Sequence, residues 1–177
     1  MTSGTSGQSR RVLMTAALTG GLTMLAGTAP ASAGPREDGG GPASGRSARE
    51  RRNKAAVLRA FAQQNAGGDL YEILHDDIDW TIVNGRTYTS KAEFLAEGSA
   101  PVMDRLVPPL VMTVQDLWTE GDIVIVRFVG DATAIDGIPY HNEYCWVWQL
   151  RGGQVVRCHA FLDMLAVREL VERVDLD

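Results

Sequence analysis

The chain has 177 residues and a formal net charge of −5, which allows one ordinary domain and argues against nucleic acid or an anionic membrane as a partner. Its two cysteines and three histidines lack the clustering and spacing of a metal site. Motifs for a nucleophile elbow, a phosphate-binding loop or a dinucleotide fold do not occur in the sequence. We therefore expect neither a metal nor an organic cofactor.

Residues 1–33 have the layout of a secretory signal peptide. Arg10 and Arg11 precede a mildly apolar run over residues 15–27, and a small-x-small cleavage signature ends at Ala33. The paired arginines favour the twin-arginine export route, and the alternative is an ordinary secretory signal. The run is too short and too rich in glycine for a membrane span, for which about 20 apolar residues are needed. Cleavage near Ala33 predicts a secreted, extracellular protein without membrane association, whose 15 basic and 22 acidic residues give a net charge of −7.

The stretch after the predicted cleavage site is rich in Gly, Pro, Ser and charged side chains and has nothing to bury. We therefore divide the chain into a signal peptide at 1–33, a flexible linker at 34–52 and one folded domain at 53–177.

Changes of hydrophobic period divide the domain into helices and strands. We expect helices over residues 49–66, 70–75, 90–106 and 164–174. We expect strands over residues 77–83, 110–118 and 123–134, and two more within 137–163. Ser90 followed by Glu93 is a capping-box pattern that opens the third helix, and Pro108-Pro109 ends it. Helices followed by a four-strand antiparallel meander predict an α+β domain that can enclose a cavity.

The two long strands within 137–163 carry the candidate site. Side chains alternate along a strand, so residues of one parity share a face. On the first of these strands that face holds Tyr140, Asn142, Tyr144, Trp146 and Trp148. An aromatic wall with few polar groups suits a pocket for a small apolar molecule that bears a ring, although the same rings can simply form the core.

Turn geometry predicts how these strands line up with their neighbours. If Gly152-Gly153 and Asp136-Gly137 each supply the two central turn residues, two rows of side chains cross three adjacent strands on the pocket face. The rows are Asp131-Asn142-Asp163 and Arg127-Trp146-His159. The same register brings Cys145 and Cys158 onto the other face, where a disulfide and two free thiols both stay open.

The element order and several short motifs resemble the NTF2-like superfamily, most closely its SnoaL-like branch of polyketide cyclase/ketosteroid isomerase-like proteins. The motifs are Glu120-Gly121-Asp122 before a Val/Ile-rich strand, the G-x-x-Y-x-N-x-Y pattern of 137–144, the run at 153–156 and the aromatic-x-Asp ending at Asp163. The likeness covers about residues 53–175. It implies a cone-like fold in which a curved antiparallel sheet wraps around N-terminal helices and encloses a pocket.

The resemblance implies an acid/base role for Asp163, which stands where SnoaL-like cyclases carry theirs, and we expect His159 or Asp131 to assist it. Alternatives are a helix cap for Asp163 and a core position for His159. Ile82 occupies the place of the ketosteroid isomerase base, which argues against steroid-type proton shuttling. A cluster like that of limonene-epoxide hydrolases would need Arg127 together with Asp131 and Asp163.

Two functions follow. The first is cofactor-free acid/base chemistry on a small apolar molecule, as isomerisation, cyclisation or dehydration, with epoxide hydrolysis as a minor alternative. The second is non-catalytic binding of a small hydrophobic ligand. The substrate-binding residues expected in both cases are Trp80, Ile82, Arg127, Tyr140, Asn142, Tyr144, Trp146 and Phe161. The resemblance also implies a homodimer, which we expect to form through the outer sheet face, where Val126, Phe128 and Val147 would be exposed.

Overall fold

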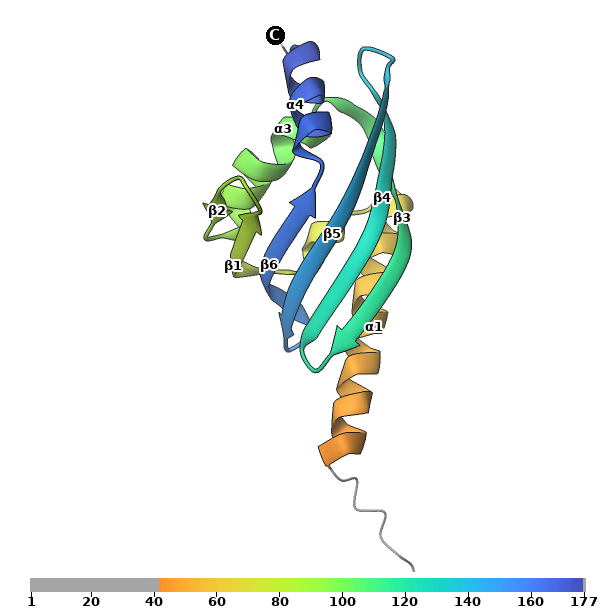
Figure 1. Cartoon of the computed structure of the whole chain (residues 1–177), viewed down its shortest axis with the longest axis vertical. Helices are drawn as coiled ribbons and strands as arrows, with labels where there is room; N and C mark the ends of the chain where they lie inside the picture. The colour runs from red at the N-terminus through yellow and green to blue at the C-terminus, as the bar shows by residue number, and fades with distance from the viewer. Residues whose placement is uncertain (1–41, 177) are drawn as a thin grey trace, which may run out of the picture. The chain divides into compact units, whose positions relative to one another are not determined.

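A curved six-stranded sheet organises the domain in the computed structural model, which describes residues 42–176 (Figure 1). The strand order is β2-β1-β6-β5-β4-β3. The strands are β1 Leu74–Ile82, β2 Thr87–Tyr88, β3 Leu106–Glu120, β4 Ile123–Ala134, β5 Pro139–Arg151 and β6 Gln154–Leu162. Neighbouring strands are antiparallel except β1 and β6, which pair in parallel. The predicted α+β class and curved sheet are confirmed, and the sheet extends beyond the predicted meander through β1 and β2.

Helices cover the concave face of the sheet (Figure 1). They are α1 Pro42–Asn65, the 3-10 turn η1 Leu70–Ile73, the helical run α2 Lys91–Glu93, η2 Phe94–Ser99 and α3 Ala100–Met103, and the C-terminal α4 Met164–Arg173. Phe61 of α1 packs edge-on against Phe128, with the ring centroids 4.9 Å apart. None of the helices between residues 42 and 176 is long and apolar enough to cross a membrane.

Helix α1 begins at Pro42, before the predicted start at residue 49, so residues 42–48, predicted as part of the flexible linker, are helical. Hydrogen bonds and ion pairs hold the first half of α1 to the β3–β4 turn, the ion pairs being Arg46–Glu120 and Arg49–Asp122. The Glu50 carboxylate accepts a hydrogen bond from the backbone N–H of Gly121 at 2.8 Å, and Asn53 Nδ2 donates to the Gly121 carbonyl at 3.2 Å. The predicted signal peptide and the rest of the linker lie outside the described residues, so export stays a prediction.

The register between β4 and β5 differs by one residue from the predicted one. The Ala134 N–H donates to the Ile138 carbonyl at 2.9 Å, so the loop closed by this pair has three residues, 135–137, instead of two, and Gly137 adopts a φ of 84°. This is the usual geometry of a three-residue hairpin loop that ends in a left-handed glycine. Asn142 therefore pairs with Gly130 instead of Asp131. The slip turns Arg127 and Asp131 to the convex face and brings Val126 and Phe128, predicted to be exposed, into the core.

A second shift lies between β5 and β6. Gly152 and Gly153 form the predicted turn with φ of 61° and 87°, and Arg151 pairs with Gln154 as expected. A bulge follows, because Leu150 pairs with Val155 whereas Gln149 pairs with Arg157. The extra residue reverses the facing of every later β6 side chain.

The reversal relocates His159 and Phe161, which lie on the convex face opposite Val147 and Cys145 instead of in the pocket. It also separates the two cysteines. Cys158 is buried on the concave side beside Trp148, and both thiols are free. The predicted placement of the cysteines on one face is therefore wrong. Dimerisation through the convex face stays a prediction.

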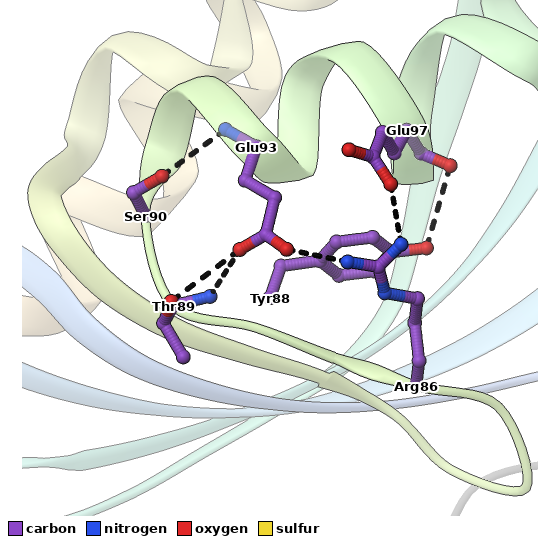
Figure 2. Close-up of polar contacts among 6 residues, drawn as sticks. All are labelled: Arg86, Tyr88, Thr89, Ser90, Glu93 and Glu97. Atoms are coloured by element: carbon purple, nitrogen blue, oxygen red, sulfur yellow. Dashed lines mark hydrogen bonds and ion pairs between the residues drawn. The ribbon is translucent and has the colours of Figure 1, made fainter.

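The predicted N-cap at Ser90 is confirmed, whereas the return hydrogen bond of Glu93 goes to Thr89, one residue before the cap, and not to Ser90 as in a regular capping box (Figure 2). Ser90 Oγ accepts from the Glu93 N–H at 3.2 Å, and the Glu93 carboxylate accepts from the Thr89 N–H at 2.8 Å. Arg86 forms ion pairs with Glu93 and Glu97 and lies 4.7 Å above the Tyr88 ring centroid. These contacts fasten the helical run 91–103 to the hairpin of β1 and β2.

The helical run is not a plain α-helix, since its middle section, η2, has π geometry. Its end was also predicted incorrectly. Pro108 and Pro109 do not terminate it but lie within β3, where the pairing with β4 is interrupted between Val107 and Val111. β3 is the last strand of the sheet, and an edge strand tolerates prolines because one side of its backbone needs no partner.

Candidate functional site

An apolar pocket lies between the concave sheet face and the helical run 91–103. The space open to the centres of water molecules is about 60 Å³. The sheet side and α4 contribute Trp80, Ile82, Leu110, Met112, Tyr144, Trp146, Ala160, Leu162 and Val167. The helical side contributes Tyr71, Phe94, Gly98, Ser99, Val102 and Met103.

Aromatic rings form the rigid part of the pocket wall. Trp80 stacks on Phe94 with the ring centroids 4.0 Å apart and meets Trp146 edge-on at 5.0 Å. Tyr71 stands edge-on to Phe94 at 5.4 Å. Stacked and edge-on pairs of this kind are the favoured aromatic geometries, so the wall is pre-formed and suited to another ring.

Hydroxyls of the pocket wall and of the residues behind it form hydrogen bonds with one another. Ser99 Oγ donates to the Tyr71 hydroxyl at 3.1 Å on the helical side. On the sheet side, the hydroxyls of Tyr144 and Tyr140 are 2.9 Å apart. Asn142 Nδ2 donates to the Tyr140 hydroxyl at 3.0 Å. The polar chemistry at this site is therefore that of neutral hydrogen-bond donors and acceptors.

Burial keeps the pocket phenols protonated. It raises the pKa of Tyr71 from 10.0 to about 12, and it also raises the pKa of Tyr140 and, more strongly, that of Tyr144. An uncharged phenol is favoured in an apolar environment because the phenolate loses its hydration there. All three groups therefore act as hydrogen-bonding hydroxyls at neutral pH, and none supplies a base.

Four predicted binding residues line the pocket: Trp80, Ile82, Tyr144 and Trp146. Two others, Tyr140 and Asn142, are buried behind it. Asn142 also receives a hydrogen bond from the Asp163 N–H and donates one to the Asp163 carbonyl, both at 3.0 Å. The predicted shared face of β5 is thus confirmed, and Asn142 joins the end of β6 to the tyrosine pair.

Asp163 does not lie on the pocket face. Its side chain is exposed and accepts hydrogen bonds from the N–H groups of Leu165 and Ala166 at 2.8 and 3.4 Å. The Asp163 side chain therefore caps α4, which was the alternative to an acid/base role in the sequence-based interpretation. The placement that its predicted acid/base role requires is therefore contradicted, because the bulge in β6 removes the cross-strand pairing with Asn142.

The other predicted catalytic and charged residues lie on the convex face. His159 and Asp131 are exposed, and the Asp131 carboxylate contacts His141 Nδ1 at 2.7 Å. Arg127 Nε donates to Asp116 at 2.9 Å and its guanidinium also pairs with Glu143. Neither predicted polar row exists, and the cluster required for epoxide hydrolysis is not assembled.

Phe161, also predicted to bind substrate, has 46% of its surface exposed on the same convex face. The lining of the pocket contains no carboxylate, imidazole or guanidinium from the described residues. No group of three or more His, Cys, Asp or Glu residues between 42 and 176 is placed to hold a metal ion.

Sequence reasoning missed the helical half of the pocket. Phe94, Gly98 and Val102 repeat every four residues after the Ser90 cap, and Ser99 and Met103 follow the same spacing one position later. That repeat marks one face of a helix and was a usable signal. Tyr71 carried a weaker signal, as it lies two residues after the capping residue Asp69.

A curved mixed sheet that encloses an apolar pocket under short helices defines an NTF2-like architecture. Residues 54–158 match the model of the SnoaL-like domain, and the chain belongs to that family. No curated protein sequence is significantly similar to the chain.

Three solved structures illustrate the similarity of this fold to known proteins. A candidate SnoaL-like polyketide cyclase from Jannaschia sp. CCS1 has 20% sequence identity and a TM-score of 0.58, and the match covers 72% of this chain and 96% of that one. An NTF2-like protein from Burkholderia pseudomallei K96243 has 17% identity and a TM-score of 0.57, covering 68% and 97%. IdmH, a candidate polyketide cyclase from Streptomyces antibioticus, has 18% identity and a TM-score of 0.52, covering 68% and 98%.

Proposed function

We propose that the domain binds a small apolar molecule that carries a ring and an oxygen able to accept a hydrogen bond. The observation that carries this proposal is the composition of the pocket: aromatic and aliphatic walls, neutral hydroxyl groups among the polar contacts, and no charged side chain among the described residues that line it. Ligand sites generally combine predominantly apolar walls with a few polar groups that fix orientation.

Tyr144 is the residue that we assign to the ligand oxygen. Asn142 donates a hydrogen bond to the Tyr140 hydroxyl, so Tyr140 can in turn donate a hydrogen bond to the Tyr144 oxygen. The Tyr144 proton is then free for an acceptor in the pocket. In this arrangement each buried hydroxyl both accepts and donates, and successive hydrogen bonds polarise one another.

The residues that line the pocket also favour binding over acid/base catalysis. Isomerisation, cyclisation and dehydration each need a group that takes a proton near neutral pH. Tyr144, a phenol whose pKa burial raises well above 10, is a poor base at that pH. Asp163, His159 and Asp131 lie outside the pocket lining. The contribution that Tyr144 can make to chemistry is hydrogen bonding to an oxygen that gains negative charge.

The test compares acetophenone with α-methylstyrene, a ligand of similar shape in which a CH₂ group replaces the carbonyl oxygen. We expect Tyr144→Phe to weaken acetophenone binding about tenfold, the net value of one good hydrogen bond, and to leave α-methylstyrene binding nearly unchanged. Quenching of tryptophan fluorescence measures both affinities. The affinities should be constant between pH 6 and 9, because the donor does not titrate in that range.

Tyr88→Phe is the matched control. Tyr88 is a buried tyrosine outside the pocket lining, and its hydroxyl donates to the Glu97 carbonyl at 3.4 Å. It should leave the affinities for both ligands unchanged. If Tyr144→Phe weakened the binding of both ligands equally, the assignment of Tyr144 would be contradicted. If the parent protein bound neither ligand, the proposed function itself would be contradicted.

A further inference from the structure

A second hollow adjoins the pocket. It offers about 330 Å³ to the centres of water molecules, compared with about 60 Å³ inside. The two spaces share three lining residues: Tyr71, Ser99 and Met103. The outer hollow is otherwise lined by Gln64, Gly67, Gly68, Asp69, Leu95, Ala100, Asp104, Pro108 and Pro109.

As it stands, the inner pocket is too small for a ring, so a ring can enter it only when flexible side chains of its wall move while the aromatic rings stay in place. A cavity of about 150 Å³ is the size known to hold benzene, which is more than twice the space available here. Met103 and Met112 are unbranched and adapt their shape easily, so the inner wall can yield. The nearest large additional volume lies beyond the shared wall of Tyr71, Ser99 and Met103.

The shared wall is closed by one neutral hydrogen bond, from Ser99 Oγ to the Tyr71 hydroxyl. Tyr71 belongs to the four-residue turn η1, and Ser99 is the last residue of the π-helical section η2. A neutral hydrogen bond contributes about fivefold to an equilibrium, since both groups can bond to water instead. Separation of these two side chains therefore has a small cost.

The outer hollow has a definite charge. Asp69 and Asp104, both exposed, are its charged residues, and no lysine or arginine between residues 42 and 176 contributes to its lining. At low ionic strength in water, a carboxylate about 7 Å from a unit charge on the ligand changes the affinity for that ligand by about threefold. The hollow thus discourages an anionic group by about tenfold and accepts a neutral or cationic one.

We propose that the ligand spans both spaces, with its ring in the inner pocket and an uncharged or cationic polar group in the outer hollow, and that the Tyr71–Ser99 pair closes the passage between them. This inference rests on the proposed function of the inner pocket. It assigns the ligand class as an amphiphile, and it assigns Asp69 and Asp104 as residues that determine charge specificity.

Three phenyl probes of equal length test the charge preference: 3-phenylpropylamine, 3-phenyl-1-propanol and 3-phenylpropionate. At about 10 mM ionic strength, where such charges are little screened, we expect the amine to bind at least as tightly as the alcohol, and the carboxylate to bind about tenfold more weakly than the alcohol. In the double variant Asp69→Asn with Asp104→Asn, the three affinities should agree within about twofold. Asn keeps the cap that Asp69 provides to η1, so the fold is preserved.

The double variant Asp76→Asn with Asp77→Asn is the matched control, because it removes the same charge from exposed positions on β1 that lie outside the outer hollow. It should preserve the order of the three probes. If Asp69→Asn with Asp104→Asn leaves the order intact while acetophenone still binds, the spanning ligand is overturned and the inner pocket stands. If no probe and no acetophenone binds, both proposals fail.

Association rates test the passage. With Trp118→Phe removing the exposed tryptophan signal, Tyr71→Phe or Ser99→Ala should each speed binding of 3-phenyl-1-propanol about fivefold in stopped-flow fluorescence. Tyr88→Phe should leave the association rate unchanged, because the Tyr88 hydroxyl bonds to the Glu97 carbonyl and Tyr88 lines neither the pocket nor the outer hollow. Unchanged rates in both Tyr71→Phe and Ser99→Ala would overturn the assignment of this pair as the closing contact.

Discussion

Replacing Asn142 by leucine should lower the free energy of unfolding by about 2–4 kcal/mol, although the two side chains are similar in size. Asn142 has only 1% of its surface exposed and serves three partners: the N–H and the carbonyl of Asp163, and the Tyr140 hydroxyl. Leucine leaves these groups in place without a hydrogen bond, at about 1–3 kcal/mol for each group that stays buried. Tyr140 keeps Tyr144, which limits the total. Urea unfolding measures the loss.

Asp163→Asn is the companion variant. Asparagine caps a helix about as well as aspartate, so the free energy of unfolding should change by less than about 0.5 kcal/mol, whereas Asp163→Ala should lose about 1 kcal/mol. Acetophenone affinity should be unaffected in Asp163→Asn. A larger loss of stability in Asp163→Asn than in Asn142→Leu would contradict the roles assigned here, in which the Asp163 backbone matters to the fold through Asn142 and its side chain acts as a cap.

Structural features that depend on a single strand or turn were predicted correctly from the sequence. Tyr140, Asn142, Tyr144, Trp146 and Trp148 share the concave face because side chains alternate strictly within one strand, and all five are buried. The N-cap at Ser90 and the Gly152-Gly153 turn were equally local and equally predictable. Each of these depends only on residues that are close together in the chain.

The register with which two neighbouring strands pair was predicted incorrectly. Asp136-Gly137 reads equally well as a two-residue turn or as the end of a three-residue loop, and only the latter places Gly130 opposite Asn142. The residues around Val156 do not indicate a bulge, because β-branched residues are equally common in regular strands. These two single-residue differences removed Arg127, Asp131, His159 and Phe161 from the pocket.

Gly98→Ala should close the pocket, weakening acetophenone binding at least tenfold and destabilising the fold by about 1–3 kcal/mol. A Cβ at this position would lie 2.7 Å from Phe94 Cδ2 and 3.0 Å from Tyr88 Cε2, closer than side chains tolerate. The Phe94 ring already stacks on Trp80 at 4.0 Å, so the strain can be relieved only by moving rings that line or support the pocket. Overpacking of this kind typically costs 1–3 kcal/mol. It outweighs the advantage of at most about 1 kcal/mol that alanine has over glycine in a helix.

Gly45→Ala measures that advantage by itself, because Gly45 lies in α1 and an added Cβ would meet no atom within 4 Å. This variant should be unchanged or up to about 1 kcal/mol more stable in urea unfolding, with acetophenone affinity intact. The two glycines thus separate helix propensity from packing. If Gly98→Ala were stabilised as much as Gly45→Ala and still bound acetophenone normally, the Phe94 ring would have to yield freely, and the rigid aromatic wall on which the proposed ligand class depends would be wrong.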